Sequence, residues 1–338
     1  MTETAELLAE RLHALPSVLA TMLLKPEIPS LTRADQPIWV TGGGMSEGPG
    51  RFLVALLQQS GLWADFVPLS EFVAPTLRCS DGTLVLLSQG LAPNARFPLR
   101  HVRSFRKTLL LTSVLADADS PLGSAPRELA VAMAQGVEVL TLPPQEESGL
   151  LLRVIGPTVQ ALAVAALAGT PWQALQEIPT LYEALLSAPP MGSLLRNGER
   201  EQLALIAGGR YGAACFGLRW KLLEGLLAGD PPIWDLLQVA HGPLQSLWST
   251  PYTLVVLMRD EAPYEAQLVD SLRRVLRPEL HRIVPLRAQK LPGFLAYFEH
   301  SAQLDALLLD AVRVTELDLI EWPSRGKDDA LYQLCPVS

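Results

Sequence analysis

The sequence predicts an α/β protein made of two tandem doubly wound, flavodoxin-like αβα sandwiches. The main reason is an internal duplication, in which each half reads as strand, glycine turn, helix and strand. IWVTGGG at 38–44 matches LALIAGG at 203–209, and TLVLLSQG at 83–90 matches TLVVLMRD at 253–260. The offset between matched segments drifts only from 165 residues at the glycine turns to 170 at the TLV segments. We therefore expect parallel sheets related by an internal pseudo-two-fold duplication.

Short apolar runs without strict polar alternation support the parallel arrangement. Such runs are typical of strands buried on both faces, and here each is followed by a segment of helix length. In the first half the predicted strands are 38–41, 64–68, 83–88, 108–112 and 137–142. Helices are predicted between them. An opening helix is predicted over 4–24, with no counterpart at the head of the second half, and two further helices over 154–188.

Turn-forming residues suggest where the modules begin and end. Residues 1–30 form the predicted N-terminal helix and its connection, 31–190 the first module, 200–320 the second module and 321–338 a C-terminal tail. The stretch 188–200 is predicted to be the linker, because proline and glycine are typical of connecting segments. It contains Pro189, Pro190, Gly192 and Gly198.

Composition and charge exclude several classes of protein. With 338 residues, 49% of them hydrophobic, the chain is long enough for two domains of about 150 residues. A formal charge of -8 with 27 Lys+Arg argues against a nucleic-acid partner. The scattered cysteines Cys79, Cys215 and Cys335 indicate neither a disulfide framework nor a metal site. Without a basic leader or an apolar run of about 18 residues, we expect a cytoplasmic protein with no membrane partner.

Two features of the sequence resemble functional motifs without matching them. The segment TGGGMSEGPG at 41–50 is similar to a dinucleotide-binding turn, but Glu47 stands where the third glycine is needed. Asp65 also falls inside a predicted strand instead of at its end, so a nucleotide-dependent enzyme is the least favoured reading. The basic stretches 100–107 and 273–287 are interpreted as solvated helix faces.

Five short segments, taken in order, resemble a known family. They are VTGGGMSEG at 40–48, SEF at 70–72, SQG at 88–90, KLLEG at 221–225 and HGP at 241–243. This order and spacing is similar to that of the double sugar isomerase (SIS) domain proteins. That family includes the isomerase half of glucosamine-fructose-6-phosphate aminotransferase, the fructosamine deglycases and related phosphosugar isomerases. The resemblance covers nearly the whole chain.

The resemblance implies a sugar isomerase or deglycase acting on an open-chain sugar or aminosugar, without a cofactor. Moving a proton between C1 and C2 needs a carboxylate, and opening the sugar ring needs a second acid or base. The matching positions are Glu224 in KLLEG and His241 in HGP. In the family this histidine reaches across from a neighbouring subunit, which implies a homodimer. The family also uses a lysine of the C-terminal tail over the site, for which Lys327 is the candidate.

The predicted ligand site lies at the carboxyl ends of the strands, where parallel α/β sheets bind their ligands. Its candidate residues are Gly43, Gly44, Ser46, Ser88, Gln89, Gly90, Asn94, Glu147 and Arg153. Relatives bind phosphate with serine and threonine hydroxyls, but Gly44, Gly90 and Pro93 stand at three of those positions. Losing three hydrogen bonds to a charged group would cost at least about 4 kcal/mol. We therefore expect a ligand that lacks a standard 6-phosphate.

A catalytically silent sugar sensor is the alternative that the sequence leaves open. The missing hydroxyls favour it, as does Ala240, which replaces the lysine that precedes HGP in the aminotransferase relative. Such a protein would keep the fold and the pocket for a sugar or sugar phosphate but would not turn it over.

Overall fold

The computed structural model describes residues 2–24, 28–73, 81–115, 125–144, 147–188, 202–327 and 331. The predicted linker beyond Ala188, Cys79, Cys335 and most of the tail after Lys327 lie outside the described residues. No helix in these ranges is long and apolar enough to cross a membrane.

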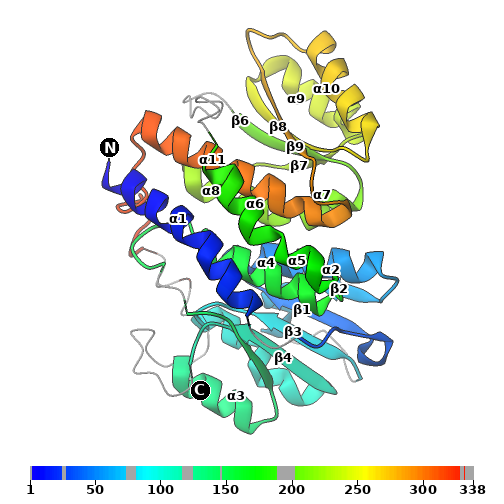
Figure 1. The fold of residues 1–338 in the computed structure, drawn as a ribbon, viewed down its shortest axis with the longest axis vertical. Coiled ribbons are helices and arrows are strands. Elements are labelled where there is room, and N and C mark those ends of the chain that lie inside the picture. The colour runs from blue at the N-terminus through cyan, green and yellow to red at the C-terminus, as the bar shows by residue number, and fades with distance from the viewer. Residues whose placement is uncertain are drawn as a thin grey trace. The chain divides into compact units, whose positions relative to one another are not determined.

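The first sheet is fully parallel and has five strands in the order β2-β1-β3-β4-β5 (Figure 1). The strands are β1 (Ile38–Gly42), β2 (Ala64–Phe66), β3 (Thr83–Leu87), β4 (Lys107–Thr112) and β5 (Glu138–Thr141). Strand β3 lies at the centre, and all five of its residues are buried. This burial is the reason its sequence, TLVLL, shows no polar alternation. The five strands predicted from the sequence are confirmed, with boundaries shifted by one or two residues.

The second sheet has four parallel strands in the order β7-β6-β8-β9. They are β6 (Gln202–Ala207), β7 (Ile233–Asp235), β8 (Tyr252–Arg259) and β9 (Arg282–Ala288). If the strands of each half are numbered from its glycine turn, both sheets follow the order 2-1-3-4, and the first sheet adds a fifth strand. The shared order confirms the duplicated, doubly wound fold class.

Eleven α-helices connect and cover the strands in the described ranges. They are α1 (Glu3–Leu23), α2 (Glu47–Gln59), α3 (Ala125–Ala134), α4 (Ile155–Leu167), α5 (Trp172–Gln176), α6 (Ile178–Leu186), α7 (Arg210–Ala214), α8 (Phe216–Leu226), α9 (Gly242–Ser249), α10 (Pro263–Val275) and α11 (Ala296–Thr315). The opening helix is confirmed. The segment 154–188 contains three helices, whereas the sequence predicted two. Gly169, at φ +80°, and Pro171 follow the end of α4, and Pro179 lies in the first turn of α6.

The described chain divides into two compact units that are discontinuous in sequence. The first-sheet unit contains residues 20–147, 155–175 and the described tail from Pro323. The second-sheet unit contains the residues up to Leu19, together with 148–154 and 176–322. Helix α4 therefore belongs to the first-sheet unit, and all thirteen of its residues are buried. The module boundaries inferred from the sequence stay predictions.

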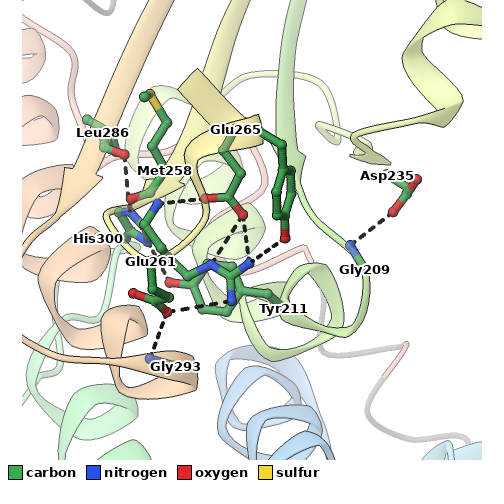
Figure 2. A network of polar contacts seen from close by, with 11 residues as sticks. Gly209, Tyr211, Asp235, Met258, Glu261, Glu265, Leu286, Gly293 and His300 are labelled. Carbon is green, nitrogen blue, oxygen red and sulfur yellow. Dashed lines mark hydrogen bonds and ion pairs between the residues drawn. The ribbon is translucent and has the colours of Figure 1, made fainter. Parts of the chain in front are cut away.

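A buried histidine joins the helices and strands of the second-sheet unit (Figure 2). His300 of α11 lies with Nε2 3.0 Å from the Met258 carbonyl and 3.1 Å from the Leu286 carbonyl. Because both partners are acceptors, Nε2 carries the proton, and Nδ1 accepts from the Tyr211 hydroxyl at 2.5 Å. Burial lowers the pKa of His300 to about 4. One neutral imidazole thus connects α7, β8, β9 and α11.

This histidine makes stability fall in mild acid. The unfolded chain protonates His300 near its ordinary pKa of 6.5, whereas the folded chain does so only near 4. The neutral imidazole contributes about 3 kcal/mol to the free energy of unfolding. This contribution is complete above about pH 6.5 and is lost as the pH falls towards 4. Urea unfolding can be measured between these pH values. The free energy of unfolding should fall less steeply with decreasing pH in His300→Gln than in the wild type. The exposed His13→Gln is the control and should keep the wild-type slope, and an identical slope in both variants would contradict the assignment.

Candidate functional site

A glycine turn connects β1 to α2 at the carboxyl edge of the first sheet. A side chain at Gly42 would come within 2.9 Å of the Ser46 carbonyl oxygen, and one at Gly43 within 2.6 Å of the Leu69 Cδ1 atom. Gly44 adopts φ +55° and has open space beside its α-carbon. The sequence therefore folds here into a tight turn whose backbone leads into the N-terminus of α2. Such a turn can offer backbone N–H groups to an oxygen-rich ligand.

The second wall of this edge is the loop after β3. Gly42 pairs with Leu87 in the sheet, so the glycine turn and Ser88 continue from neighbouring strand ends. The Gln89 carbonyl accepts from the Ser113 N–H at 3.0 Å and from the Thr112 hydroxyl at 3.1 Å. These bonds attach the loop to the end of β4. Ser88 is buried and Gln89 is half-buried.

Glu147 occupies the N-terminus of α4. Its Oε1 atom accepts from the Ile155 N–H at 2.8 Å and its Oε2 atom from the Gly156 N–H at 2.7 Å. The Gln89 Nε2 atom lies 3.5 Å from Oε2. The carboxylate is almost completely buried and lies where the helix dipole favours negative charge. The N–H groups of Ile155 and Gly156, which could otherwise bind a ligand anion, are therefore already satisfied by the protein itself.

Gly156 allows Gln89 to lie against the first turn of α4. A β-carbon at this position would overlap all three terminal atoms of the Gln89 side chain. The carboxamide is thus held between the helix backbone and the Glu147 carboxylate. Of the predicted ligand residues, the structure brings Gln89 and Glu147 into contact, with Gly43, Gly44, Ser46, Ser88 and Gly90 on the adjacent turn and loop. Asn94 lies in the short 3-10 helix η4 (Pro93–Arg96), and Arg153 is exposed and belongs to the second-sheet unit.

The KLLEG segment lies in α8, and two of its residues attach this helix to α11. The Lys221 Nζ atom lies 2.7 Å from both carboxylate oxygens of Asp305 and 2.8 Å from the Ser301 hydroxyl, and the Lys221 side chain is only 1% exposed. A β-carbon at Gly225 would come within 3.0 Å of the Leu308 side chain. Glu224, which is half-buried, therefore lies on a helix fixed on both sides of it.

The remaining predicted catalytic residues are exposed. His241 lies between β7 and α9, and its N–H donates to the Gln238 carbonyl at 3.0 Å. Glu224 precedes β7 and His241 follows it in the chain. Lys327 donates from Nζ to the Pro323 carbonyl at 2.9 Å. The catalytic roles of these three residues stay predictions.

The carboxyl edge of the second sheet is lined with acids that accept from its own backbone (Figure 2). Asp235 accepts from the Gly209 and Leu237 N–H groups, both at 3.0 Å. Glu261 accepts from Gly293 at 2.9 Å. Glu299 accepts from three consecutive N–H groups, at residues 289–291. These bonds leave the first sheet as the better location for a ligand that needs backbone donors.

Arg259 at the end of β8 belongs to the same internally satisfied edge. Its guanidinium donates from Nη2 to Glu265 Oε1 at 2.7 Å and lies 4.6 Å from the centre of the Tyr211 ring. Glu265 also accepts from the Arg259 N–H at 2.6 Å and is completely buried. Arg259 and Glu265 were not predicted as a pair from the sequence. The only sign of it there is a Glu six residues after the Arg that ends a strand.

The described residues offer neither a reactive cysteine nor a metal site. Burial raises the pKa of Cys215 to about 12, so this thiol stays protonated and is not a nucleophile. In the ranges that the structure covers, no three His, Cys, Asp or Glu side chains are grouped to hold a metal ion.

Comparison with known proteins identifies the fold through solved structures. No protein-family model and no curated protein matches the sequence. Glucosamine-6-phosphate deaminase from Thermotoga maritima superimposes with a TM-score of 0.69 at 13% identity, over 95% of this chain and 98% of that chain. The C-terminal domain of glucosamine-fructose-6-phosphate aminotransferase from Francisella tularensis gives 0.67 at 13%, over 94% and 98%. Tagatose-6-phosphate ketose/aldose isomerase from Escherichia coli gives 0.66 at 15%, over 94% and 93%.

The ion pair that fixes α8 should be a major contributor to stability. Lys221→Met would leave the Asp305 carboxylate buried without its cation, which costs about 3 to 5 kcal/mol. The double variant Lys221→Met/Asp305→Leu should recover most of this loss. Urea unfolding of these variants can be compared with Lys107→Met, which removes the exposed pair with Glu138 and should cost only about 0 to 1 kcal/mol. Similar losses in Lys221→Met and Lys107→Met would show that the buried pair is unimportant.

Proposed function

We propose that this chain acts on an open-chain sugar or aminosugar as an aldose-ketose isomerase or a deglycase. The observation that carries the proposal is the rigid support of Glu224, because α8 is attached to α11 by Lys221 and Gly225 on either side of that residue. Proton transfer at carbon requires a carboxylate held in a fixed position. The proteins named above, which share the fold along nearly their whole length, act on phosphorylated sugars or amino sugars according to their names.

The proposed isomerisation is a proton shift with no net redox change. Glu224 removes the proton from C2 of the open-chain aldose, and the resulting enediol receives that proton back at C1. The hydroxyl proton on O2 moves to O1, so the aldehyde at C1 becomes a ketone at C2. His241 would transfer the proton that opens the sugar ring, and Lys327 is the candidate for the third group. A homodimer in which His241 serves the neighbouring subunit belongs to the same proposal.

The ligand contacts at the carboxyl edge of the first sheet are a separate part of the proposal, because these residues and Glu224 belong to different units. The backbone of Gly43 and Gly44 and the side chains of Ser88 and Gln89 would bind the sugar oxygens. Glu147 supports the expectation that the ligand lacks a standard 6-phosphate, because its carboxylate already takes the N–H groups at the start of α4. A second anion there would be repelled by this charge.

Replacing the proposed base should abolish turnover without unfolding the protein. Glu224→Gln keeps the shape of the side chain but removes its basicity, so the rate of C1–C2 proton exchange should fall by about 10² to 10⁴. The measurement is deuterium incorporation from D₂O into candidate sugars, followed by NMR. Glu183→Gln on the exposed side of α6 is the matched control and should retain full exchange. Equal exchange in wild type and Glu224→Gln would exclude Glu224 as the base.

The expectation that the ligand lacks a 6-phosphate can be tested by calorimetry. Fructose 6-phosphate and glucosamine 6-phosphate should bind no more tightly than their unphosphorylated forms, because the hydroxyl positions are lost and Glu147 adds negative charge. Isothermal titration of all four sugars compares the affinities directly. Micromolar binding of either phosphate that is lost in Gln89→Ala, with weaker binding of its parent sugar, would refute the expected ligand class at this edge.

A silent sugar sensor is the second candidate, favoured by the replaced hydroxyls and by Ala240 before His241. It makes a different prediction for the same experiments. A sensor binds one of the sugars in calorimetry, with binding reduced in Gln89→Ala, but gives no deuterium exchange in wild type.

A further inference from the structure

A basic cavity lies in the first-sheet unit, between α3 and the 3-10 helices that follow β3. Its volume is about 580 Å³, which is within the range of small-molecule sites. One wall comes from η4 (Pro93–Arg96) and η5 (Pro98–Ser104), and the other from α3. The lining residues are Pro93, Arg96, Leu99, Arg100, Arg103, Glu128, Val131, Ala132 and Gln135. None of them belongs to the candidate site.

Three arginines line this cavity from one wall. Arg100 and Arg103 lie one turn apart on the 3-10 helix η5, so their side chains share a face, and Arg96 comes from the preceding helix η4. Glu128 is the single acidic side chain among the lining residues. Like charges this close repel one another, and the whole chain carries a net charge of -8. The interpretation of 100–107 as a solvated face agrees with the exposure of Arg100 and Arg103, and these two side chains also line the cavity.

Contacts with the protein restrict two of the arginine side chains before any ligand binds. The Arg96 Nε atom donates to the Leu91 carbonyl at 2.7 Å. The Arg100 guanidinium lies 5.3 Å from the centre of the Phe97 ring. Groups held in this way lose less conformational freedom on binding. Because Leu91 directly follows Gly90, Arg96 also connects the cavity to the loop that carries Ser88 and Gln89.

We propose that this cavity is a second binding site, which takes a small molecule bearing phosphate groups. Guanidinium groups bind the oxygens of phosphate through paired N–H donors, and three of them along one wall suit a ligand with several such oxygens. Gln135 and Glu128 on the α3 wall can bind hydroxyl groups of the same ligand. This site is separate from the Ser88–Gln89 edge, where the sugar is proposed to bind without a 6-phosphate.

The test is calorimetric titration of the full chain with inorganic pyrophosphate, and it requires no turnover. Saturable binding is expected in wild type. Arg100→Gln and Arg103→Gln should each weaken it by about tenfold or more, because each removes a charged hydrogen-bond donor. Glu128→Gln should tighten it, because a repelling charge is lost. Arg127→Gln removes an exposed positive charge of α3 that does not line the cavity, and it should bind as wild type does.

Several outcomes would overturn the proposal. One is the absence of saturable pyrophosphate binding in the wild type. Another is an equal loss of pyrophosphate affinity in Arg127→Gln and Arg103→Gln, which would indicate nonspecific attraction. Loss of binding in Gln89→Ala with full binding in Arg103→Gln would place the ion at the sugar edge instead. Citrate is the carboxylate comparison, and tighter binding of citrate than of pyrophosphate would refute the phosphate class. Circular dichroism of each variant verifies that it is folded.

Discussion

The carboxylate of Glu147 at the start of α4 is the interaction on which the candidate site depends most. It satisfies two N–H groups of a helix that has no exposed residue, and it lies beside the Gln89 carboxamide. Backbone donors buried without a partner would cost about 1 to 3 kcal/mol each. The same bonds therefore stabilise the helix, restrict Gln89 and introduce a fixed negative charge. The chemistry of the ligand follows from this charge as much as from the groups that remain available.

The two sheets share one strand order but use their carboxyl edges differently. In the second-sheet unit, Asp235, Glu261, Glu265 and Glu299 accept from backbone N–H groups at or just after the strand ends. In the first-sheet unit, β1 ends at Gly42 and is followed by two more glycines and no acid before Glu47, whose carboxylate accepts from Arg51 at 2.8 Å. One copy of the duplicated module thus has a self-satisfied edge, while the other keeps a bare turn. The two copies of the repeated fold therefore offer different groups at their carboxyl edges.

Much of the fold could be predicted from the sequence, because burial leaves a local signature. Strand β3 and its counterpart β8 are central and buried, so both appear as unbroken apolar runs that begin with TLV. The resemblance to the aminotransferase was inferred from short segments such as SQG, KLLEG and HGP. The C-terminal domain of such an aminotransferase is among the solved structures that share the fold. The separation of α5 from α6 was missed, since the turn at Glu177 carries no glycine and Pro179 lies already inside the next helix.

The site was less predictable, because its contacts join residues far apart in the chain. Lys221 is part of a recognisable segment, but its partner Asp305 follows 84 residues later on a helix with no motif of its own. Glu147 stays a predicted ligand residue, but its bonds to the N–H groups of Ile155 and Gly156 at the start of α4 could not be read from the sequence. Arg100 and Arg103 fall in the basic stretch 100–107, but only the packing of α3 opposite them creates a cavity. Sequence spacing specifies which residues share a face, and tertiary packing decides what that face meets.

The complete burial of α4 also has a consequence for motion at the carboxyl edge of the first sheet. A helix enclosed on every side can release its amide protons to solvent only when much of the surrounding unit opens, so its hydrogen exchange approaches the rate set by global unfolding. Gln89 packs on the first turn of this slow-exchanging element. The edge is thus anchored to a fully buried helix, which leaves Gln89 little freedom to rearrange when a ligand binds.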